Sequence, residues 1–247
     1  MTAPLDPDLL LRAYTVGVFP MADSRKARSV YWVEPKSRAI LPLDGFHLSR
    51  SLRKTLLSDR FTTTADTAFG SIVALCAESA DDRPDTWINR QIEHAVATLH
   101  AAGRAHSIET WAGGALVGGL YGIALGRAFF GESMVSRATD ASKVALAHLV
   151  ARLRVGGYTL LDCQFMTPHL ASLGAVEISR DAYIALLDGA VSSLDGGVAS
   201  AGTASAVGDF FAFDRAGALA PDSESESTTV SGPASGWRIV QALTQTS

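Results

Sequence analysis

Apolar and polar positions are most clearly patterned in the middle of the chain, where two apolar runs flank a short turn. Residues 115–125 and 128–135 are rich in Val, Ile, Leu, Tyr and Phe. Gly126-Arg127 lies between the two runs, and glycine readily adopts the backbone conformations that tight turns require. This pattern predicts a β-hairpin.

A helix and a further strand are predicted directly after the hairpin. From Leu146 onward, apolar residues recur at the i, i+3, i+4 and i+7 positions that form one face of a helix. Thr139 or Asp140 can cap the start of this helix, and Gly156-Gly157 favours its end. Residues 158–165 are an apolar run whose length is typical of a buried strand.

Polar side chains interrupt these apolar strands at three positions. Asp162 and Gln164 are two residues apart, so in a strand they lie on the same face. The same spacing predicts a shared face for Glu132 and Met134. Each acid also has a purely structural explanation. Asp162 can cap a turn at the strand end, and Glu132 can form an ion pair with an arginine such as Arg137. Two acids and an amide in neighbouring apolar strands favour a functional site just as strongly.

The apolar pattern outside this stretch predicts short elements on both sides. The expected helices lie at residues 7–17, 48–58, 69–80, 90–102 and 180–187. The expected strands lie on either side of Pro35 within residues 30–43, and at residues 61–65 and 107–111. Residues 17–21 and 167–175 are expected to form a bend and a turn.

Composition divides the chain into four expected segments. These are a smaller N-terminal α/β domain with a basic face at residues 1–65, the main domain at residues 66–187, a linker at residues 188–236 and a C-terminal element at residues 237–247. The linker is acidic and rich in Gly, Ala and Ser, which is typical of flexible chain. Phe210, Phe211 and Phe213 are candidates to dock back onto the main domain.

Length and composition predict a globular protein of the cytoplasm. With 247 residues and 47% hydrophobic side chains, the chain can bury one sizeable core or two modest ones. We expect no membrane-spanning segment, because no apolar run is long enough, and no signal peptide, because the start is acidic. Cys76 and Cys163 are the only cysteines and the histidines form no ligand cluster, so neither a disulfide framework nor a metal site is expected.

A net charge of -4 conceals a basic segment near the N-terminus. Residues 25–60 hold nine Lys and Arg against three acidic residues. Arg50, Arg53 and Lys54 lie on the expected helix 48–58, mostly away from its apolar face. Such a patch can make weak, salt-sensitive contacts with a phosphate backbone, and an ordinary solvated surface explains it as well.

The order hairpin, helix, strand resembles the core of acetyltransferases of the GNAT superfamily. This resemblance implies an α+β fold with a GNAT-like mixed sheet flanked by helices. Those enzymes hold the pyrophosphate of acyl-CoA on backbone amides of a glycine-rich turn before the helix. The corresponding turn here, residues 136–143, reads SRATDASK and has no glycine. The acyl donor is therefore not expected to be a coenzyme A thioester.

A collinear series of motifs narrows the resemblance. Over about residues 14–187 the chain is similar to the leucyl/phenylalanyl-tRNA-protein transferases, in the stretches GVFPM, YWVEPKSRAILP, HLSRSLRKTL, TWINRQI, HSIETW, GESMVSR, LDCQ and HLASLGAVEI. This family transfers leucine or phenylalanine from tRNA to the N-terminal amine of proteins that begin with Lys or Arg, which marks them for N-end rule degradation. The resemblance implies this activity, with methionine as a further candidate donor, no cofactor, no membrane partner and a monomeric enzyme.

The resemblance also implies roles for individual residues. The motifs LDCQ and GESM place Asp162, Gln164 and Glu132 at the catalytic positions. The residues implied for the aminoacyl pocket are Trp32, Trp87, Phe129, Gly131, Met134 and Leu161. The residues implied for tRNA binding are Arg50, Arg53, Lys54, Ser142 and Lys143. Lys143 lies in the first turn of its helix, where a cation opposes the helix dipole. This unfavourable placement indicates a contact with a tRNA phosphate or with the terminal ribose, and a lysine that faces solvent is the alternative.

The chemistry of this reaction sets different demands on Asp162 and Gln164. An aminoacyl ester is already activated, so the enzyme has to orient it, assist proton loss from the amine and stabilise the tetrahedral oxyanion. The amine has a pKa of about 7.7 to 8.0, and an ordinary aspartate with a pKa of about 3.9 is a poor base for it. We expect Asp162 to orient Gln164, whose amide oxygen accepts a hydrogen bond from the amine. Asp162 as a direct base is the alternative, and Glu132 is the candidate that attracts a cationic acceptor.

Two other functions are consistent with parts of the sequence. A GNAT-type N-acetyltransferase that acts on small amines predicts binding of acetyl-CoA despite the SRATDASK turn. A non-catalytic protein that binds tRNA or degradation substrates predicts binding without turnover. The joint presence of Glu132, Asp162 and Gln164 disfavours this second alternative.

Overall fold

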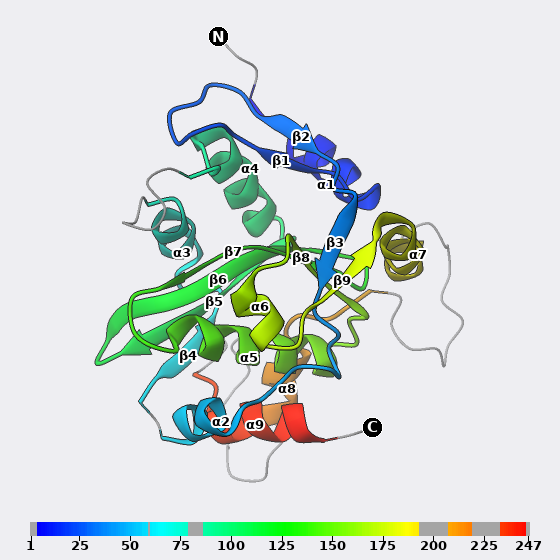
Figure 1. Ribbon diagram of the computed structural model, residues 1–247. Coiled ribbons are helices and arrows are strands. Elements are labelled where there is room, and N and C mark those ends of the chain that lie inside the picture. Colours follow the sequence, from blue (N-terminus) through cyan, green and yellow to red (C-terminus); the bar gives the residue numbers. More distant parts are fainter. Residues whose placement is uncertain (1–3, 59, 79–85, 193–206, 219–232, 246–247) are drawn as a thin grey trace.

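A seven-stranded mixed sheet lies between two layers of helices in the computed structural model, which describes residues 4–58, 60–78, 86–192, 207–218 and 233–245 (Figure 1). The strands, in spatial order, are β4 (Thr62–Ala65), β5 (Ala105–Ala112), β6 (Ala115–Leu125), β7 (Ala128–Ser136), β8 (Leu160–Gln164), β3 (Ser37–Ile40) and β9 (Val176–Ser179). The expected α+β fold, with a mixed sheet flanked by helices, is confirmed.

The predicted hairpin forms the middle of this sheet. β6 and β7 pair antiparallel from Leu125 and Ala128 onward, and Gly126 in the turn has a φ of 60°. α5 (Ala141–Val155) follows, and β8 then pairs parallel to β7, so the expected helix and strand are both confirmed. Asp140 occupies the expected N-cap position, although its side chain makes no capping hydrogen bond and its carboxylate accepts one from Lys143 instead.

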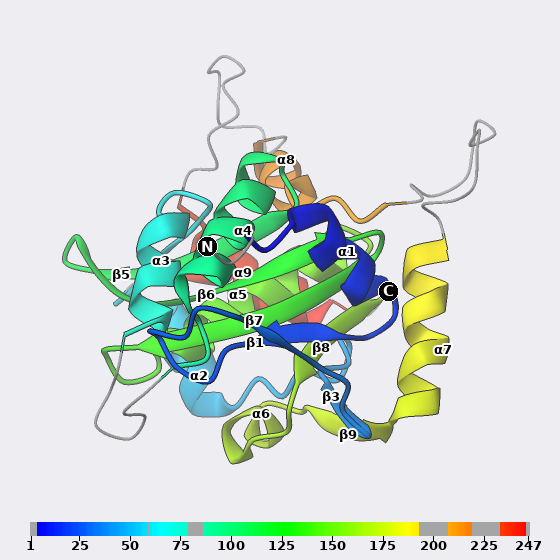
Figure 2. The same cartoon turned by 90° about the horizontal axis from the view of Figure 1, so that it is seen from above.

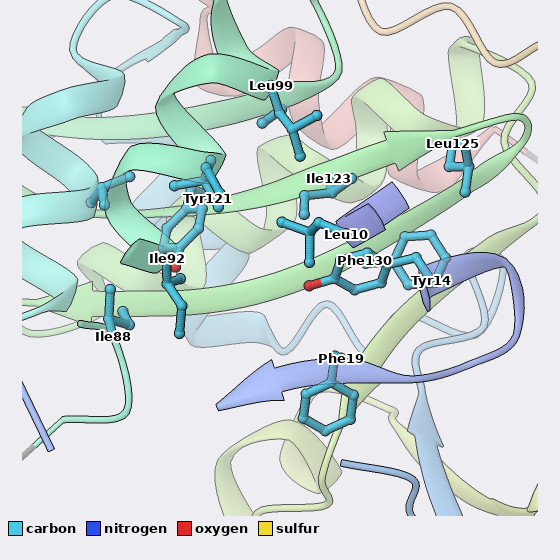
Figure 3. Close-up of a cluster of buried hydrophobic side chains, with 14 of the residues drawn as sticks. Leu10, Tyr14, Phe19, Ile88, Ile92, Leu99, Tyr121, Ile123, Leu125 and Phe130 are labelled. Atoms are coloured by element: carbon cyan, nitrogen blue, oxygen red, sulfur yellow. The ribbon is translucent and has the colours of Figure 1, made fainter. Parts of the chain in front are cut away.

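Helices cover both faces of the sheet and enclose two hydrophobic clusters (Figures 1 and 2). The first cluster, whose centre Figure 3 shows, includes side chains from α1 (Pro7–Thr15), α3 (Phe69–Cys76), α4 (Arg90–Ala101) and α7 (Arg180–Val191). The second includes side chains from α2 (Arg50–Leu57), α5, α6 (Pro168–Ser172), α8 (Ala212–Ala218) and α9 (Gly236–Thr244). Because both faces are covered, the central strands are apolar along much of their length.

Two segments that were expected to be connections form regular elements. Residues 17–21, expected as a bend, contain β1 (Phe19–Met21), which pairs with β2 (Tyr31–Val33) in a separate two-stranded sheet. Residues 167–175, expected as a turn, contain α6, whose first turn is capped by the Thr167 hydroxyl. Elements this short have too few residues to show a period, and β1 is defined by its distant partner.

A β-bulge in β7 changes the faces that its side chains occupy. Tyr121 pairs with Ser133 and Gly122 pairs with Gly131, so Glu132 is the extra residue of β7. The Glu132 carboxylate accepts a hydrogen bond from Tyr14, whose ring belongs to the first cluster, whereas Met134 packs against the second cluster. The expectation that Glu132 and Met134 share a face is therefore wrong.

The segments predicted from composition meet in the same body. β3 and β4 lie within residues 1–65, yet both are strands of the seven-stranded sheet, and the domain boundary after residue 65 stays a prediction. In the predicted linker, Phe210 and Phe213 are buried, whereas residues 193–206 and 219–232 lie outside the described residues. α9, which corresponds to the expected C-terminal element, packs against α5.

Candidate active site

Asp162, at the centre of β8, forms a buried ion pair with Arg38 of β3. The Arg38 guanidinium donates from Nη2 to Asp162 Oδ2 at 2.6 Å and from Nε to Oδ1 at 2.9 Å. The two residues are only 1% and 0% exposed. Arg38 also donates to the Gly17 carbonyl at 3.1 Å, and its guanidinium lies 4.7 Å from the ring centre of Phe19. This dense set of partners compensates for the loss of water around two buried charges.

Further donors occupy both carboxylate oxygens of Asp162. The Tyr183 hydroxyl donates to Oδ2 at 2.8 Å, and the backbone N–H of Gln164 donates to Oδ1 at 2.8 Å. Gln164 has a φ of 62°, a conformation that non-glycine residues rarely adopt. Asp162 therefore holds the backbone turn that carries Gln164. Because both of its carboxylate oxygens already accept hydrogen bonds, Asp162 is better suited to orient Gln164 than to take a proton from the substrate.

Glu132 links the side chain of Gln164 to α1. Its Oε1 accepts hydrogen bonds at 2.8 Å from the Tyr14 hydroxyl and at 2.8 Å from the Gln164 amide nitrogen. Burial raises the pKa of Glu132 to about 8, and the nearby Asp162 charge adds to this effect, although the hydrogen bond from Tyr14 acts in the opposite direction. Because the nitrogen of the Gln164 amide is engaged, its oxygen is the atom left to accept a hydrogen bond from a substrate.

The structural explanation offered for Glu132 does not apply. Arg137, the suggested partner, forms an ion pair with Glu78 on the surface, where both side chains are about half exposed. Glu132 itself is 7% exposed and has no ion pair among the described residues. A buried acid whose contacts are a tyrosine and a glutamine is a recurrent feature of functional sites.

A cavity of about 320 Å³ opens where β7 and β8 diverge. Their pairing ends at Phe130 and Asp162, although β7 continues to Ser136. Glu132 and Gln164 line one part of the cavity, and its apolar wall is formed by Leu120, Met134, Leu146, Leu149, Leu161 and Leu170. A polar end and a long apolar wall suit a ligand with an aliphatic or aromatic side chain and a polar head.

The residues implied for the aminoacyl pocket divide into two groups. Gly131, Met134 and Leu161 line this cavity, whereas the other three do not. Phe129 is fully buried and stacks on Phe210, and Trp87 is partly buried against the first cluster. Trp32 lies on β2 with 39% of its surface exposed.

Cys163 also lines the cavity, and it packs against the second hydrophobic cluster. Burial raises the pKa of its thiol well above the usual range, and the Asp162 charge adds to this effect. The thiol therefore stays protonated near neutral pH and is not an activated nucleophile.

The residues implied for tRNA binding lie on two helices. Arg50, Arg53 and Lys54 are exposed on α2, opposite the buried leucines of the same helix. In the first turn of α5, Ser142 is buried and Lys143 Nζ lies 2.9 Å from Asp140 Oδ1. In Figure 1, α2 lies on the side of the sheet opposite α1.

Sequence reasoning missed three residues that hold the acids in place: Arg38, Tyr14 and Tyr183. Arg38 was counted only as part of the basic segment, although a charged residue next to Ala39 and Ile40 in a strand interrupts an apolar pattern. The two tyrosines fit the apolar faces of their helices, so nothing local distinguished them from core residues.

The described part of the chain shows neither a metal centre nor a membrane span. Within it, no group of three or more His, Cys, Asp or Glu residues is arranged to hold a metal ion. None of the described helices is long and apolar enough to cross a bilayer.

Comparison with known proteins gives one consistent result. The family model described as leucyl/phenylalanyl-tRNA protein transferase matches residues 40–188, and the model for the N-terminal domain of that family matches residues 3–36. The leucyl/phenylalanyl-tRNA–protein transferase of Rhizorhabdus wittichii is 64% identical over 250 residues, which cover 98% of this chain and 99% of the relative. The protein of the same name from Zymomonas mobilis is 62% identical over 193 residues, which cover 78% of this chain and 72% of the relative.

Solved structures resemble the chain more distantly. The crystal structure of FemX matches with a TM-score of 0.44 and 11% sequence identity, and the match covers 70% of this chain and 66% of that one.

Proposed function

This chain belongs to the leucyl/phenylalanyl-tRNA protein transferase family, and from that premise we propose that it transfers leucine or phenylalanine from tRNA to the N-terminal amine of proteins that begin with Lys or Arg. The observation that carries the proposal is the junction of Glu132 and Gln164 at one part of a largely apolar cavity. The transfer would mark the acceptor for N-end rule degradation, in the cytoplasm and by a monomeric enzyme.

The reaction needs few groups from the enzyme. The acceptor amine attacks the ester carbonyl, a C–N bond forms, the C–O bond to the ribose breaks, and a proton passes from the amine to the ribose oxygen that leaves. The Gln164 amide oxygen is free to accept a hydrogen bond from the amine, because the amide nitrogen already donates to Glu132. The ion pair with Arg38 holds Asp162 as a fixed acceptor for the Gln164 backbone, so that Asp162 positions Gln164.

The charges around the site support a cationic acceptor. Arg38 compensates Asp162, whereas Glu132 has no ion pair among the described residues and lines the cavity. A cation that approaches Glu132 would favour its charged form and gain an ion pair. Acceptors that begin with Lys or Arg bring such a cation beside the amine.

The apolar wall supports a donor with a long, unbranched or aromatic side chain. Leucine side chains from four elements and Met134 provide it, and a side chain branched at Cβ would crowd the ester at the polar end. One methylene discriminates between donors by only about 1 to 3 kcal/mol, so leucine, phenylalanine and methionine are all candidate donors.

The test is transfer of labelled leucine from leucyl-tRNA to a peptide that begins with Arg, compared with the same peptide beginning with Glu. We expect label on the Arg peptide alone. Acetyl-CoA labelled in the acetyl group serves as a parallel donor. Acetyl transfer without leucyl transfer would show that the activity is an acetyltransferase, and label on both peptides would contradict the proposed acceptor preference.

A further inference from the structure

One nitrogen at the cavity has no hydrogen-bond partner. In the described part of the chain, the buried side-chain polar atoms without a partner belong to Tyr121, His148, Arg152 and His169. Of these four residues, Tyr121 and His169 line the cavity between β7 and β8. Tyr121 is fully buried, with its ring in the first hydrophobic cluster, whereas the side chain of His169 is only partly buried. His169 Nε2 is therefore the remaining candidate to meet a ligand.

The backbone of α6 fixes the position of His169. The Thr167 hydroxyl caps the helix through Leu170 N–H at 3.2 Å, and Leu170 anchors α6 in the second hydrophobic cluster. The Ser172 hydroxyl donates to the His169 carbonyl at 2.7 Å. The ring is thus presented by an ordered turn, and a buried nitrogen left without a partner costs free energy unless a ligand supplies one.

The surroundings of His169 favour a neutral ring that meets an oxygen. Burial lowers the pKa of His169, and the charge of Lys143 lowers it further. A neutral imidazole can donate or accept one hydrogen bond at Nε2, which matches a hydroxyl group. The positive charge of Lys143 close by disfavours an ammonium group as the partner.

The donor ester offers three polar groups to His169: its α-ammonium group, its carbonyl oxygen and the ribose hydroxyl next to the ester oxygen. The nearby charge of Lys143 disfavours the ammonium group. Of the other two, only the hydroxyl can both donate and accept a hydrogen bond, so it suits either tautomer of the neutral imidazole. Resting on the proposed function, we propose that His169 is a substrate-binding residue whose Nε2 forms a hydrogen bond with this vicinal hydroxyl.

The proposal predicts that the imidazole and the hydroxyl act as a pair. The experiment compares parent protein and His169→Phe with two phenylalanyl-tRNAs, one with an ordinary terminal ribose and one, charged chemically, whose terminal ribose lacks the vicinal hydroxyl. With the ordinary donor, we expect His169→Phe to lower kcat/KM by about tenfold, which corresponds to one lost hydrogen bond. For the parent, removal of the hydroxyl from the donor should lower kcat/KM by about the same factor. For His169→Phe, it should leave kcat/KM almost unchanged.

Two further variants separate binding from a role in folding. Thr98→Ala removes a hydrogen bond within α4, from the Thr98 hydroxyl to the His94 carbonyl, and changes no residue that lines the cavity, so its kcat/KM should stay at the parent value. His169→Gln can place an amide nitrogen near the position of Nε2, so it should retain more activity than His169→Phe and remain sensitive to the hydroxyl. If His169→Phe does not fold, His169→Gln still carries the comparison between the two donors.

The outcomes distinguish this inference from the proposed function. If the parent transfers no phenylalanine from the ordinary donor, the proposed function fails. If the parent does transfer, but the losses from the substitution and from the missing hydroxyl multiply to about a hundredfold, only the role of His169 is overturned.

Discussion

Asp162 and Glu132 are two acids of one site, and their surroundings give them different properties. Asp162 is paired with Arg38 and accepts hydrogen bonds from Tyr183 and Gln164. Glu132 has only neutral hydrogen-bond donors, and burial raises its pKa to about 8. Carboxyl groups with different surroundings can take different roles, one as a fixed charge and one as a group that titrates near neutral pH.

The raised pKa of Glu132 predicts a pH-dependent stability. Between the ordinary pKa of 4.5 and about 8, the folded protein holds a proton at Glu132 that the unfolded chain has lost. The free energy of unfolding of the parent should therefore fall as the pH rises through this window, relative to Glu132→Gln, by up to about 1.4 kcal/mol per pH unit. Urea unfolding of both proteins at several pH values in this range measures the difference. A difference that stays constant across the window would contradict the prediction.

Loss of Arg38 should destabilise the protein strongly. Arg38→Met leaves the Asp162 carboxylate buried without its cation, and breaking a buried pair in this way costs about 3 to 5 kcal/mol. The matched control is Arg180→Met, because Arg180 pairs with Glu34 on the surface, where both side chains are about half exposed. The control should cost less than about 1 kcal/mol in denaturant unfolding. Equal losses for the two variants would show that the buried pair has no special importance.

At the scale of elements, the site depends on two irregularities of the central strands. β7 carries the bulge at Glu132, and β8 stops pairing with β7 at Asp162. Together they open a cavity in a region that two regular parallel strands would close with backbone hydrogen bonds. β6, which pairs with β7 beside this opening, approaches its neighbours at Gly118, Gly119 and Gly122 so closely that only glycine fits.

Gly122 provides a test of this close packing. A Cβ at Gly122 would lie 2.3 Å from the Phe130 carbonyl oxygen and 2.4 Å from the Phe129 ring, so Gly122→Ala must displace β7 beside the bulge. We expect a loss of about 1 to 3 kcal/mol in unfolding free energy, together with lower transfer activity. Gly70→Ala is the control, because a Cβ there meets nothing within 4 Å and α3 should gain up to about 1 kcal/mol. An unaffected Gly122→Ala protein would disprove the steric argument.

Local periodicity predicted the elements with long apolar runs and missed the features made by distant contacts. β6, β7, α5 and β8 are confirmed, because the three strands lie in continuous apolar runs and α5 repeats its apolar positions over enough residues to define a period. The bulge at Glu132 leaves no local signal, so the face of Met134 was predicted incorrectly. Arg38, Tyr14 and Tyr183 come from β3, α1 and α7, and only the tertiary fold brings them to β8 and Glu132.

At the scale of the whole molecule, the C-terminal part of the chain packs onto the second face of the sheet. Arg152 of α5 is 1% exposed and donates to both carboxylate oxygens of Asp214, at 2.6 and 2.7 Å. Its guanidinium lies over the Phe210 ring at 4.9 Å. The buried guanidinium of Arg152 therefore holds the segment that contains Phe210 and Asp214 against α5. The composition of that segment predicted the docking of its phenylalanines but not this ion pair.

Removal of the Asp214 charge should detach this segment or destabilise the whole protein. Asp214→Asn leaves the Arg152 guanidinium buried without an anion, and we expect a loss of about 3 to 5 kcal/mol in unfolding free energy. Glu78→Gln, which removes the acid of the exposed pair with Arg137, should cost less than about 1 kcal/mol. Increased protease cleavage near residue 210 without a change in global stability would indicate local detachment. No change in either measurement would contradict the role of this pair.

The most direct test of the account is the single-turnover rate of leucyl transfer by Gln164→Ala. The Gln164 amide oxygen is proposed to accept a hydrogen bond from the attacking amine, and Glu132 and Asp162 hold Gln164 in place. With the donor bound, we predict a rate at least about 100-fold below that of the parent. The unfolding midpoint of the variant should stay close to the parent value. A folded Gln164→Ala protein that transfers leucine at the parent rate would contradict the central claim.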